Sequence, residues 1–460
     1  MKSIKIHFLG ASCTVTGSKF LLESQEANIL IDCGMFQGIK ELREKNWEPF
    51  PVDASIIDFV LLTHAHLDHT GYLPRLVKQG FRGKIIGTAP TLGITEIILR
   101  DSGKIHEESA ERANEEGYTK HQPAEAFYTI REAENTLGFF RSEEIDHWIT
   151  LTKNIKYRFQ YNGHILGATF IELDISGKIF VFSGDIGREH DLLLYPPKKP
   201  EYADYLFVES TYGNKLHPVE SVSEKLVGLI NETIENRGTL IIPSFAVERL
   251  QTLMFILWKL YKENLIPDIP VFIDSPMGNN VLSVFQKFPD WHKIPPKDFI
   301  AMQNRMNIIT SYKETWETID NPRPKIVIAG SGMVTGGRVL TYLQQLIDRP
   351  STLIMLVGYQ AEGTRGRQLF EGAQEIKFFG KYYPVKAKVH HIESLSAHAD
   401  QNGLLDWMSE IKNTPEEVFL IHGEPTALDA FRVKIKDTYN WKATIPKLNE
   451  IREIKIEISE

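Results

Sequence analysis

The sequence predicts an α/β protein of two lobes, with the second lobe inserted into the first. The chain has 460 residues, enough for two or three domains of average size. Its amino-terminal and carboxyl-terminal parts both carry His and Asp residues directly after short apolar runs. Between these parts, apolar runs alternate with amphipathic stretches, the pattern of a mostly parallel sheet flanked by helices.

Composition is typical of a cytoplasmic globular protein. Hydrophobic residues make up 42% of the chain, and no apolar run approaches the roughly 18 residues that a membrane span requires. The start lacks the apolar segment of a signal peptide. The two cysteines, Cys13 and Cys33, argue against a disulfide framework and are expected to be buried core residues. The net charge of −8 excludes a protein coated in basic patches, but a metal cluster and a few arginines can still create a local positive field.

Short apolar runs in the first lobe predict strands, and several of them end in a candidate metal ligand. Strands are expected over residues 3–9, 18–23, 28–31, 56–62, 155–161, 169–175 and 178–182, with a helix over 72–80. Only Ser176 and Gly177 separate the last two strands, which favours a hairpin. The charged stretch 91–141 predicts solvated helix that covers the sheet. His106 and His121 in this stretch lack ligand-like spacing, so we expect both at the surface.

The second lobe is predicted to contain strands that alternate with helices. A proline-rich segment, 195–200, marks a linker or a rigid crossing before it. Strands are expected over residues 205–209, 239–243, 270–275, 325–330 and 352–358, and helices over 219–236, 247–264 and 337–348. Such alternation favours parallel strands, because each crossover helix returns the chain to the same edge of the sheet. Ligand-rich strand ends return at 394–400 and 418–424, so we expect the second lobe to be an insertion.

The segment 63–69, with sequence THAHLDH, is the densest group of metal-binding residue types in the chain. It follows a predicted buried strand and precedes a predicted helix, at the kind of strand end where open α/β sheets place ligand sites. In an extended segment His64 and His66 point to the same side. A turn then brings Asp68 and His69 near a second point. Two imidazoles for one cation, with a carboxylate and an imidazole for another, are the ligands expected of a two-zinc hydrolytic site.

Further ligands are expected at other strand ends. The first zinc set is predicted to consist of His64, His66 and His164, and the second set of Asp68, His69 and His422. Asp185 can bridge the two cations with its two oxygens. Asp32 is expected to be an outer acceptor that fixes the orientation of a ligand.

The order of these residues resembles the metallo-β-lactamase fold in its RNA-processing branch, the β-CASP nucleases. Three matches carry the resemblance: Glu209 resembles motif A of the family, His398 resembles motif B and His422 resembles motif C. Motif C is His in the RNA-acting members and usually a small apolar residue in the DNA-acting members. The resemblance extends from Gly10 to His422. Within the family, the chain is similar to the group that contains the endonuclease subunit of the cleavage and polyadenylation machinery and its prokaryotic homologues.

The resemblance implies an αββα sandwich with an inserted α/β domain. The implied domains are residues 1–208 and 385–460 (metallo-β-lactamase) and residues 209–384 (β-CASP). It also implies two Zn²⁺ per chain and a hydroxide between them that attacks phosphorus, so that RNA is cut to leave 5′-phosphate and 3′-hydroxyl ends. Asp68 is expected to be catalytic as well as a ligand. His398 is the implied general acid, kept protonated by Glu209.

Glycine-rich loops in the second lobe suit contacts with the phosphates of a single-stranded RNA substrate. The loop 329–338 joins a strand to a helix, so its backbone N–H groups face an anion. The loop 358–367 adds two arginines, and 243–249 adds an aromatic ring and a guanidinium. For any one loop, a plain tight turn is an equal alternative. The expected substrate-binding residues are Ser244, Arg249, Gly330, Ser331, Gly332, Arg338, Arg365 and Arg367.

Two rival functions stay open. A small-molecule metallohydrolase, such as a phosphoesterase, lactonase or thioesterase, would need only the first lobe, so the insertion and the Glu209–His398 pair argue against it. A catalytically silent RNA-binding subunit is the other rival, and the filled ligand positions argue against that. The sequence leaves open whether cleavage is endonucleolytic, 5′-to-3′ exonucleolytic or both, and whether DNA is cut. The oligomeric state is also open, with a homodimer as one option.

Overall fold

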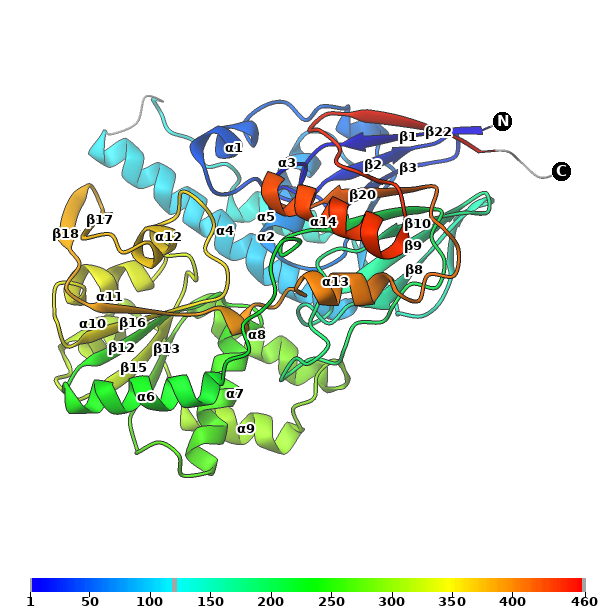
Figure 1. The fold of residues 1–460 in the computed structure, drawn as a ribbon. Helices are drawn as coiled ribbons and strands as arrows, with labels where there is room; N and C mark the ends of the chain where they lie inside the picture. The colour runs from blue at the N-terminus through cyan, green and yellow to red at the C-terminus, as the bar shows by residue number, and fades with distance from the viewer. Residues whose placement is uncertain (1, 118–121, 457–460) are drawn as a thin grey trace. The chain divides into compact units, whose positions relative to one another are not determined.

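Two seven-stranded sheets contain most of the strand ends on which ligands were predicted (Figure 1). The computed structural model describes residues 2–117 and 122–456. The first sheet has the order β22-β1-β2-β3-β4-β5-β6 and is antiparallel from β22 to β3 and parallel from β3 to β6. Its strands are β1 (Lys2–Phe8), β2 (Phe20–Glu23), β3 (Asn28–Ile31), β4 (Phe59–Leu61), β5 (Lys84–Gly87), β6 (Phe140–Ser142) and β22 (Ile451–Ile456).

The second sheet has the order β21-β20-β11-β10-β9-β8-β7, parallel from β21 to β10 and antiparallel from β10 to β7. Its strands are β7 (Ile149–Thr152), β8 (Ile155–Tyr161), β9 (Thr169–Ile175), β10 (Lys178–Phe182), β11 (Tyr205–Glu209), β20 (Glu417–Ile421) and β21 (Ala443–Thr444). The predicted hairpin is confirmed, because β9 and β10 pair in antiparallel register across Ser176 and Gly177.

A layer of aromatic side chains fills the space between the two sheets. Phe8 and Phe20 from the first sheet pack with Phe182 and Phe207 from the second. The rings of Phe182 and Phe207 stack with their centroids 4.1 Å apart. Stacked phenylalanines bury large apolar surfaces, so this layer joins the two sheets into a sandwich.

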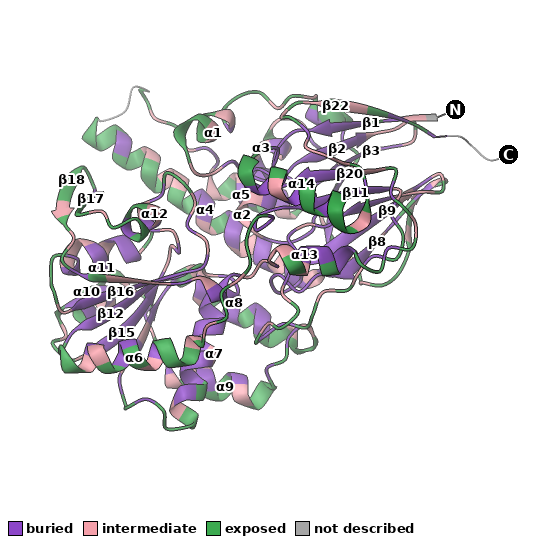
Figure 2. Ribbon diagram, in the orientation of Figure 1, coloured by how far each residue is buried: buried purple, intermediate pink, exposed green. Residues whose placement is uncertain are grey.

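Helices cover the outer face of each sheet (Figure 2). The first sheet packs against α3, α4 and α5, and the second packs against α13 and α14. The helices of this part are α1 (Lys40–Lys45), α2 (Leu67–Thr70), α3 (Leu73–Lys78), α4 (Ala89–Glu116), α5 (Ile130–Leu137), α13 (Gln401–Met408) and α14 (Pro425–Tyr439). The predicted αββα sandwich is therefore confirmed.

A third sheet forms the core of the inserted part. All five pairs in its order β14-β13-β15-β12-β16-β19 are parallel, as predicted. The strands are β12 (Thr239–Pro243), β13 (Val271–Asp274), β14 (Asn307–Ile308), β15 (Lys325–Ala329), β16 (Thr352–Val357) and β19 (Lys388–Ile392). The helices are α6 (Val222–Glu235), α7 (Arg249–Lys262), α8 (Pro276–Lys287), α9 (Pro296–Arg305), α10 (Tyr312–Asp320), α11 (Val339–Leu346) and α12 (Arg365–Phe370). A separate hairpin consists of β17 (Glu375–Phe378) and β18 (Lys381–Pro384).

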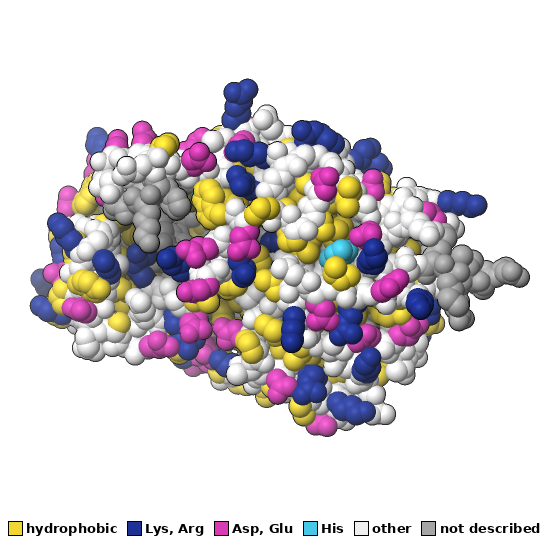
Figure 3. All heavy atoms as spheres, turned by 90° about the horizontal axis from the view of Figure 1, so that it is seen from above, with side chains coloured by type: hydrophobic (Ala, Val, Ile, Leu, Met, Phe, Trp, Pro, Cys, Tyr) yellow, Lys and Arg dark blue, Asp and Glu magenta, His cyan; other side chains and the backbone are white. Residues whose placement is uncertain are grey.

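The chain divides into two compact units. Residues 1–216 and 398–460 form unit 1, which contains the sandwich, and residues 217–397 form unit 2, which contains the parallel sheet. Within the described residues, every helix is too short or too polar to cross a bilayer. On the face drawn in Figure 3, Lys and Arg side chains lie interspersed with Asp and Glu side chains.

Three predictions about single residues differ from the structure or lie beyond it. Cys33 is buried as expected, but Cys13 is exposed, in the loop between β1 and β2. His106 is half-buried rather than at the surface, since its ring packs edge-on against Tyr128 with the centroids 4.7 Å apart. His121 lies outside the described residues.

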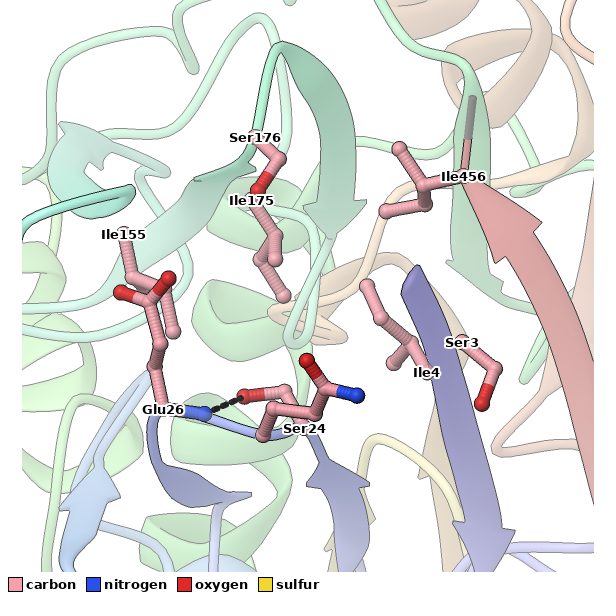
Figure 4. Close-up of a pocket in the computed structure, with 9 residues that line it drawn as sticks. Ser3, Ile4, Ser24, Glu26, Ile155, Ile175, Ser176 and Ile456 are labelled. Atoms are coloured by element: carbon pink, nitrogen blue, oxygen red, sulfur yellow. Dashed lines mark hydrogen bonds between the residues drawn. The ribbon is translucent and has the colours of Figure 1, made fainter. Parts of the chain in front are cut away.

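A small pocket lies at the end of the sandwich remote from the metal-ligand segments (Figure 4). It is lined by Ser3, Ile4, Ser24, Gln25, Glu26, Ile155, Ile175, Ser176 and Ile456. Ile155 begins β8 and His164 follows the end of the same strand, so the length of the strand, about 23 Å, separates the two positions. This pocket is therefore distinct from the predicted site.

The aromatic layer generates a stability prediction. Phe207→Ala should lower the free energy of unfolding of unit 1 by about 3–5 kcal/mol, because it leaves a cavity among fully buried rings. Chemical denaturation followed by circular dichroism measures the change. Leu192→Ala, at a position that is 47% exposed, is the control and should change stability by less than about 0.5 kcal/mol. Equal losses in the two variants would contradict the assigned core.

Candidate metal centre

The segment 63–69 leaves the end of β4 in an extended conformation and then turns into the short helix α2. His66 has φ −56° and ψ 151° and precedes the first helical residue, Leu67. The extended part carries His64 and His66, and the helical turn carries Asp68 and His69. The turn predicted from the sequence is thus the first turn of a helix, and it separates the two pairs of side chains.

Backbone hydrogen bonds from the segment that follows β3 hold this turn in place. The N–H groups of Cys33 and Met35 donate to the carbonyl oxygens of His69 and Leu67, at 2.7 and 3.1 Å. A Cβ atom on Gly34 would lie 1.6 Å from the carbonyl oxygen of Asp68, so only glycine allows this approach. The helical turn that carries Asp68 and His69 is therefore fixed by backbone contacts.

The first predicted ligand set is assembled in the structure. His66 Nδ1 lies 3.2 Å from both His64 Nε2 and His164 Nε2. Asp185 Oδ2 lies 3.4 Å from His64 Nε2 and 3.5 Å from His164 Nε2. Three imidazole nitrogens and one carboxylate oxygen thus surround one point.

The second predicted set lies on the other side of the same carboxylate. His69 Nε2 and His422 Nε2 are 3.3 Å apart, and Asp68 Oδ2 is 3.3 Å from His422 Nε2. Asp185 Oδ1 lies 3.3 Å from His69 Nε2. Because its two oxygens face different ligand sets, Asp185 has the position required of a bridging carboxylate.

These separations fit metal ions of the size and geometry of zinc. In a tetrahedral zinc site with bonds of about 2.0–2.1 Å, two ligand atoms lie about 3.3–3.4 Å apart. The separations within the first set are 3.2–3.5 Å. Asp185 Oδ1 is also buried without a hydrogen-bond donor among the described residues, an arrangement that costs free energy unless a cation is nearby. The donor set can therefore hold metal.

Burial keeps the imidazoles of the first set in the form that binds metal. Desolvation lowers the pKa of His64 to about 3 and that of His66 to about 4, and it lowers the pKa of His164 well below its usual value. All three rings are therefore neutral at physiological pH, and a neutral imidazole has the free lone pair that a metal ion requires.

Outer partners orient the rings of the second set. His69 Nδ1 lies 2.7 Å from Asp32 Oδ2, and Asp32 also accepts from the Thr63 hydroxyl at 2.8 Å. His422 Nδ1 lies 3.2 Å from the Thr211 hydroxyl. A carboxylate behind a ligating histidine fixes the ring and raises its basicity. Asp32 thus occupies the outer position that the sequence indicated, although its role stays a prediction.

Three supporting residues were not found from the sequence. Thr63 contacts the carboxylate of Asp32 and lies 3.1 Å from His64 Nδ1. Asn162 is buried, and its amide donates to the carbonyl oxygens of Ser183 and Asp185 at 2.7 and 2.6 Å, which fixes the loop that presents Asp185. Thr211 supports His422. In the sequence, only the short distance from these three residues to predicted ligands or motifs could have indicated their supporting roles.

Glu209, which is buried, and His398, which is partly buried, form a pair beside the first ligand set. Glu209 ends β11, and its Oε1 lies 3.0 Å from His398 Nδ1 and accepts from the Ile186 N–H at 2.8 Å. The other nitrogen of His398, Nε2, lies 3.9 Å from Asp185 Oδ2. Burial alone would lower the pKa of His398, but Glu209 and Asp185 outweigh it and raise this pKa to about 9. The ring is therefore positively charged at neutral pH.

The predicted substrate-binding residues all lie in unit 2, in loops at the carboxyl ends of its strands or at nearby helix starts. The Ser331 hydroxyl accepts from the N–H groups of Thr335 and Gly336, at 3.0 and 3.1 Å, and so shapes the loop after β15. The aromatic ring of Phe245 lies against Gly332, where a Cβ would be 2.5 Å from it. Ser244 donates to the carbonyl oxygen of Phe245 at 3.0 Å. Gly330 accepts from the N–H of Val339, where α11 begins.

The predicted arginines have partners inside the protein. Arg338 donates to the Thr315 hydroxyl at 2.6 Å, and Arg365 donates to the carbonyl oxygen of Lys377 at 2.7 Å. Arg367 pairs with Glu371 at 2.6 Å. Arg249 begins α7 and is buried. Contacts of these side chains with RNA stay predictions, and Arg338 has a structural role as well.

Comparison with protein families matches three parts of the chain. Residues 16–88 match the metallo-β-lactamase superfamily, residues 250–369 match the Beta-Casp domain, and residues 382–446 match the Zn-dependent metallo-hydrolase RNA specificity domain. The chain is 33% identical to Ribonuclease TTHA0252 of Thermus thermophilus, over 91% of this chain and 93% of the relative. It belongs to the β-CASP family of the metallo-β-lactamase superfamily.

Other β-CASP relatives cover most of the chain. The RNase J-like protein of Methanocaldococcus jannaschii is 33% identical over 95% of both chains. Transcription termination factor FttA of Methanosarcina mazei is 31% identical over 92% of this chain and 67% of its own length. A crystal structure of a protein of unknown function from Enterococcus faecalis shares the fold, with a TM-score of 0.54, 12% identity, and coverage of 98% of this chain and 100% of that one.

The family assignment confirms the predicted fold and agrees with a metal-binding site. The domain limits predicted at 208/209 and 384/385 stay predictions, because the matched ranges and the compact units end at other residues. The Zn-dependent description of one matched domain and the His/Asp cluster together support metal binding.

The bridging geometry generates a prediction about metal content. His64→Ala should remove metal from the first set, and Asp185→Asn should reduce metal at both sets, because the two oxygens of Asp185 face one set each. Metal analysis of the purified variants by inductively coupled plasma mass spectrometry measures this. His147→Ala, at an exposed histidine remote from the cluster in sequence, is the control. Wild-type metal content in His64→Ala and Asp185→Asn would remove the ligand assignment.

Proposed function

We propose that this β-CASP protein is a zinc-dependent ribonuclease that hydrolyses phosphodiester bonds of single-stranded RNA. The observation that carries the proposal is the cluster in which Asp185 faces two ligand sets, with His398 Nε2 3.9 Å from the same carboxylate. The RNA-specificity domain match and the names of two full-length relatives, a ribonuclease and an RNase J-like protein, support RNA as the substrate.

Two Zn²⁺ per chain are the proposed cofactors. The first set offers three nitrogens and one oxygen, and the second offers two nitrogens with the oxygens of Asp68 and Asp185. Such mixed imidazole and carboxylate sets, with four donors each, are typical of zinc. We also propose a cytoplasmic location, which the free thiols of Cys13 and Cys33 support.

The residues of the site provide orientation and a proton. Bound zinc ions would supply an activated water nucleophile and neutralise charge on the phosphoryl group. Asp185 faces both ligand sets with its two oxygens, and Asp68 faces His422 in the second set. His398 holds a proton on Nε2 and can transfer it to the departing O3′, which otherwise leaves as a poor alkoxide. Glu209 keeps His398 protonated, because its Oε1 lies 3.0 Å from Nδ1 of the ring. The Ile186 N–H donates to the same oxygen and holds it in place.

The discriminating experiment is cleavage of an end-labelled single-stranded RNA with mapping of the product ends. We expect 5′-phosphate and 3′-hydroxyl ends and loss of activity with a chelator. Parallel assays with single-stranded DNA and with bis-(p-nitrophenyl) phosphate test the rival hydrolase. Activity toward the small ester without RNA cleavage would favour a small-molecule hydrolase, and binding without cleavage would favour a silent subunit.

A pair of variants separates the proton donor from the metal ligands. His398→Ala should retain wild-type zinc yet lose roughly two to four orders of magnitude in the cleavage rate, the scale of general acid catalysis. His422→Ala should instead lose zinc, because its nitrogen faces Asp68 and His69. Zinc content and single-turnover rates measure both effects. If His398→Ala lost zinc and His422→Ala kept it, the two assignments would have to be exchanged.

A salt series tests the contribution of the arginines in unit 2. Arg367 is 38% exposed at its side chain and forms an i,i+4 ion pair with Glu371, so Arg367→Ala should spare the fold. If Arg367 contacts a phosphate, the variant should flatten the log–log salt dependence of RNA binding by about 0.7. Sequence preference should stay unchanged, since phosphate contacts carry no base information. Arg432→Ala, an exposed arginine of unit 1 with a similar pairing, is the control, and equal slopes in both variants would argue against the contact.

A further inference from the structure

An exposed tyrosine in the first turn of α10 has a largely buried guanidinium over its ring. Tyr312 is 59% exposed, and Cζ of Arg338 lies 3.5 Å from the centroid of its ring. The side chain of Arg338 is only 12% exposed. One face of the tyrosine ring is thus covered by Arg338, whereas most of the residue is open to solvent.

The guanidinium behind the ring is held by a buried network. Arg338 donates to the Thr315 hydroxyl at 2.6 Å, and its Nε lies 3.8 Å from Asp274 Oδ1. Asp274 is fully buried, and its Oδ2 accepts from Thr315 at 2.6 Å and from the Tyr342 hydroxyl at 2.9 Å. Because Thr315 and Asp274 are buried, the guanidinium is held in place before any ligand arrives, and it supports one face of the Tyr312 ring.

The ring lies at the ligand-binding edge of the parallel sheet. Asp274 is the last residue of β13, Tyr312 follows β14, and Arg338 follows the glycine-rich loop after β15. These three strands are parallel neighbours, so their carboxyl ends meet at one edge, where open α/β sheets bind ligands. Phe245, which follows β12 and is 37% exposed, adds a second ring at this edge.

The chemistry of the ring suits a nucleobase. An aromatic ring with one face free offers a flat surface on which any base can stack, and a guanidinium behind it stiffens that surface. The carboxylate nearest to Tyr312 in sequence is that of Glu314. It already accepts hydrogen bonds from the N–H and hydroxyl of Thr310, at 2.8 and 3.0 Å. Trp316, one helical turn further along α10, is 44% exposed and extends the aromatic surface.

We propose that Tyr312, backed by Arg338, is a stacking position for an unpaired base of the RNA substrate. The proposal rests on the proposed ribonuclease function and adds a contact with a base to the expected contacts with phosphates. It also gives Arg338 a role in substrate binding that acts through Tyr312. Single-strand preference follows directly, because a base in a duplex has no free face to stack on the ring.

The test measures RNA affinity in zinc-loaded His398→Ala protein, in which cleavage is slow. Fluorescence anisotropy with a labelled single-stranded RNA should show that Tyr312→Ala weakens binding by about 5- to 150-fold, the range for losing one base stack. Tyr312→Trp should keep the affinity. Tyr382→Ala is the matched control. Tyr382 lies in the same unit, is 63% exposed and also has a cationic side chain over its ring, with Lys377 Nζ 5.5 Å from the centroid. It differs from Tyr312 in its place, because it precedes the amino end of β19, at the opposite edge of the sheet.

An abasic scan of the RNA separates base stacking from a change in the fold. In protein with Tyr312, removing one particular base should weaken binding, and in Tyr312→Ala removing the same base should have no effect. Equal sensitivity to every abasic position in the two proteins, or equal affinity of Tyr312→Ala and Tyr382→Ala, would overturn the proposal. Cleavage of the same RNA by the protein with His398 intact tests the ribonuclease function separately. Cleavage with unchanged Tyr312→Ala affinity would reject only the stacking position.

Discussion

One carboxylate shared by two ligand sets determines the architecture of the site. Asp185 faces the first set with Oδ2 and the second with Oδ1. Imidazole nitrogens of both sets must therefore lie close to this one side chain, at 3.4 Å for His64 Nε2 and 3.3 Å for His69 Nε2. Residues separated by more than 350 positions in the chain, such as Asp68 and His422, have to meet at this point. The sandwich achieves this because the carboxyl ends of β4, β10 and β20 open onto the same region.

Holding these groups together costs free energy that the surrounding fold must offset. Asp32 and His422 have φ values of 56° and 50°, in the left-handed region that non-glycine residues rarely adopt, at a cost of about 1–3 kcal/mol each. The imidazoles of the first set are neutral, with His64 and His164 buried and His66 partly buried, and Asp185 is a buried anion. Bound cations would offset part of this cost. The stacked rings of Phe182 and Phe207, in the strands that lead to the site, help to keep these groups in place.

The fold and the clustering of the candidate ligands were largely predictable, because both depend on local patterns. Apolar runs gave most strands of the sheets, and ligands followed strand ends at His164, Asp185 and His422. The prediction from the sequence contained no helix at α8, α9 or α10, although each of them buries apolar side chains, such as Phe285, Phe299 and Ile319. It also missed Thr63 and Asn162, since hydroxyls and amides gain their roles only from contacts made after folding. The arginine loops were found, but the pairing of Arg338 with Asp274 depends on tertiary contacts that no spacing encodes.

The proposed function requires two metal positions that flank Asp185. The most direct test is a crystal structure of the zinc-loaded protein, with anomalous scattering recorded on both sides of the zinc absorption edge. We predict two anomalous peaks, one beside each oxygen of Asp185 and about 3.5–4 Å apart, as in two-metal hydrolases. A single peak, or zinc bound away from Asp185, would contradict the account.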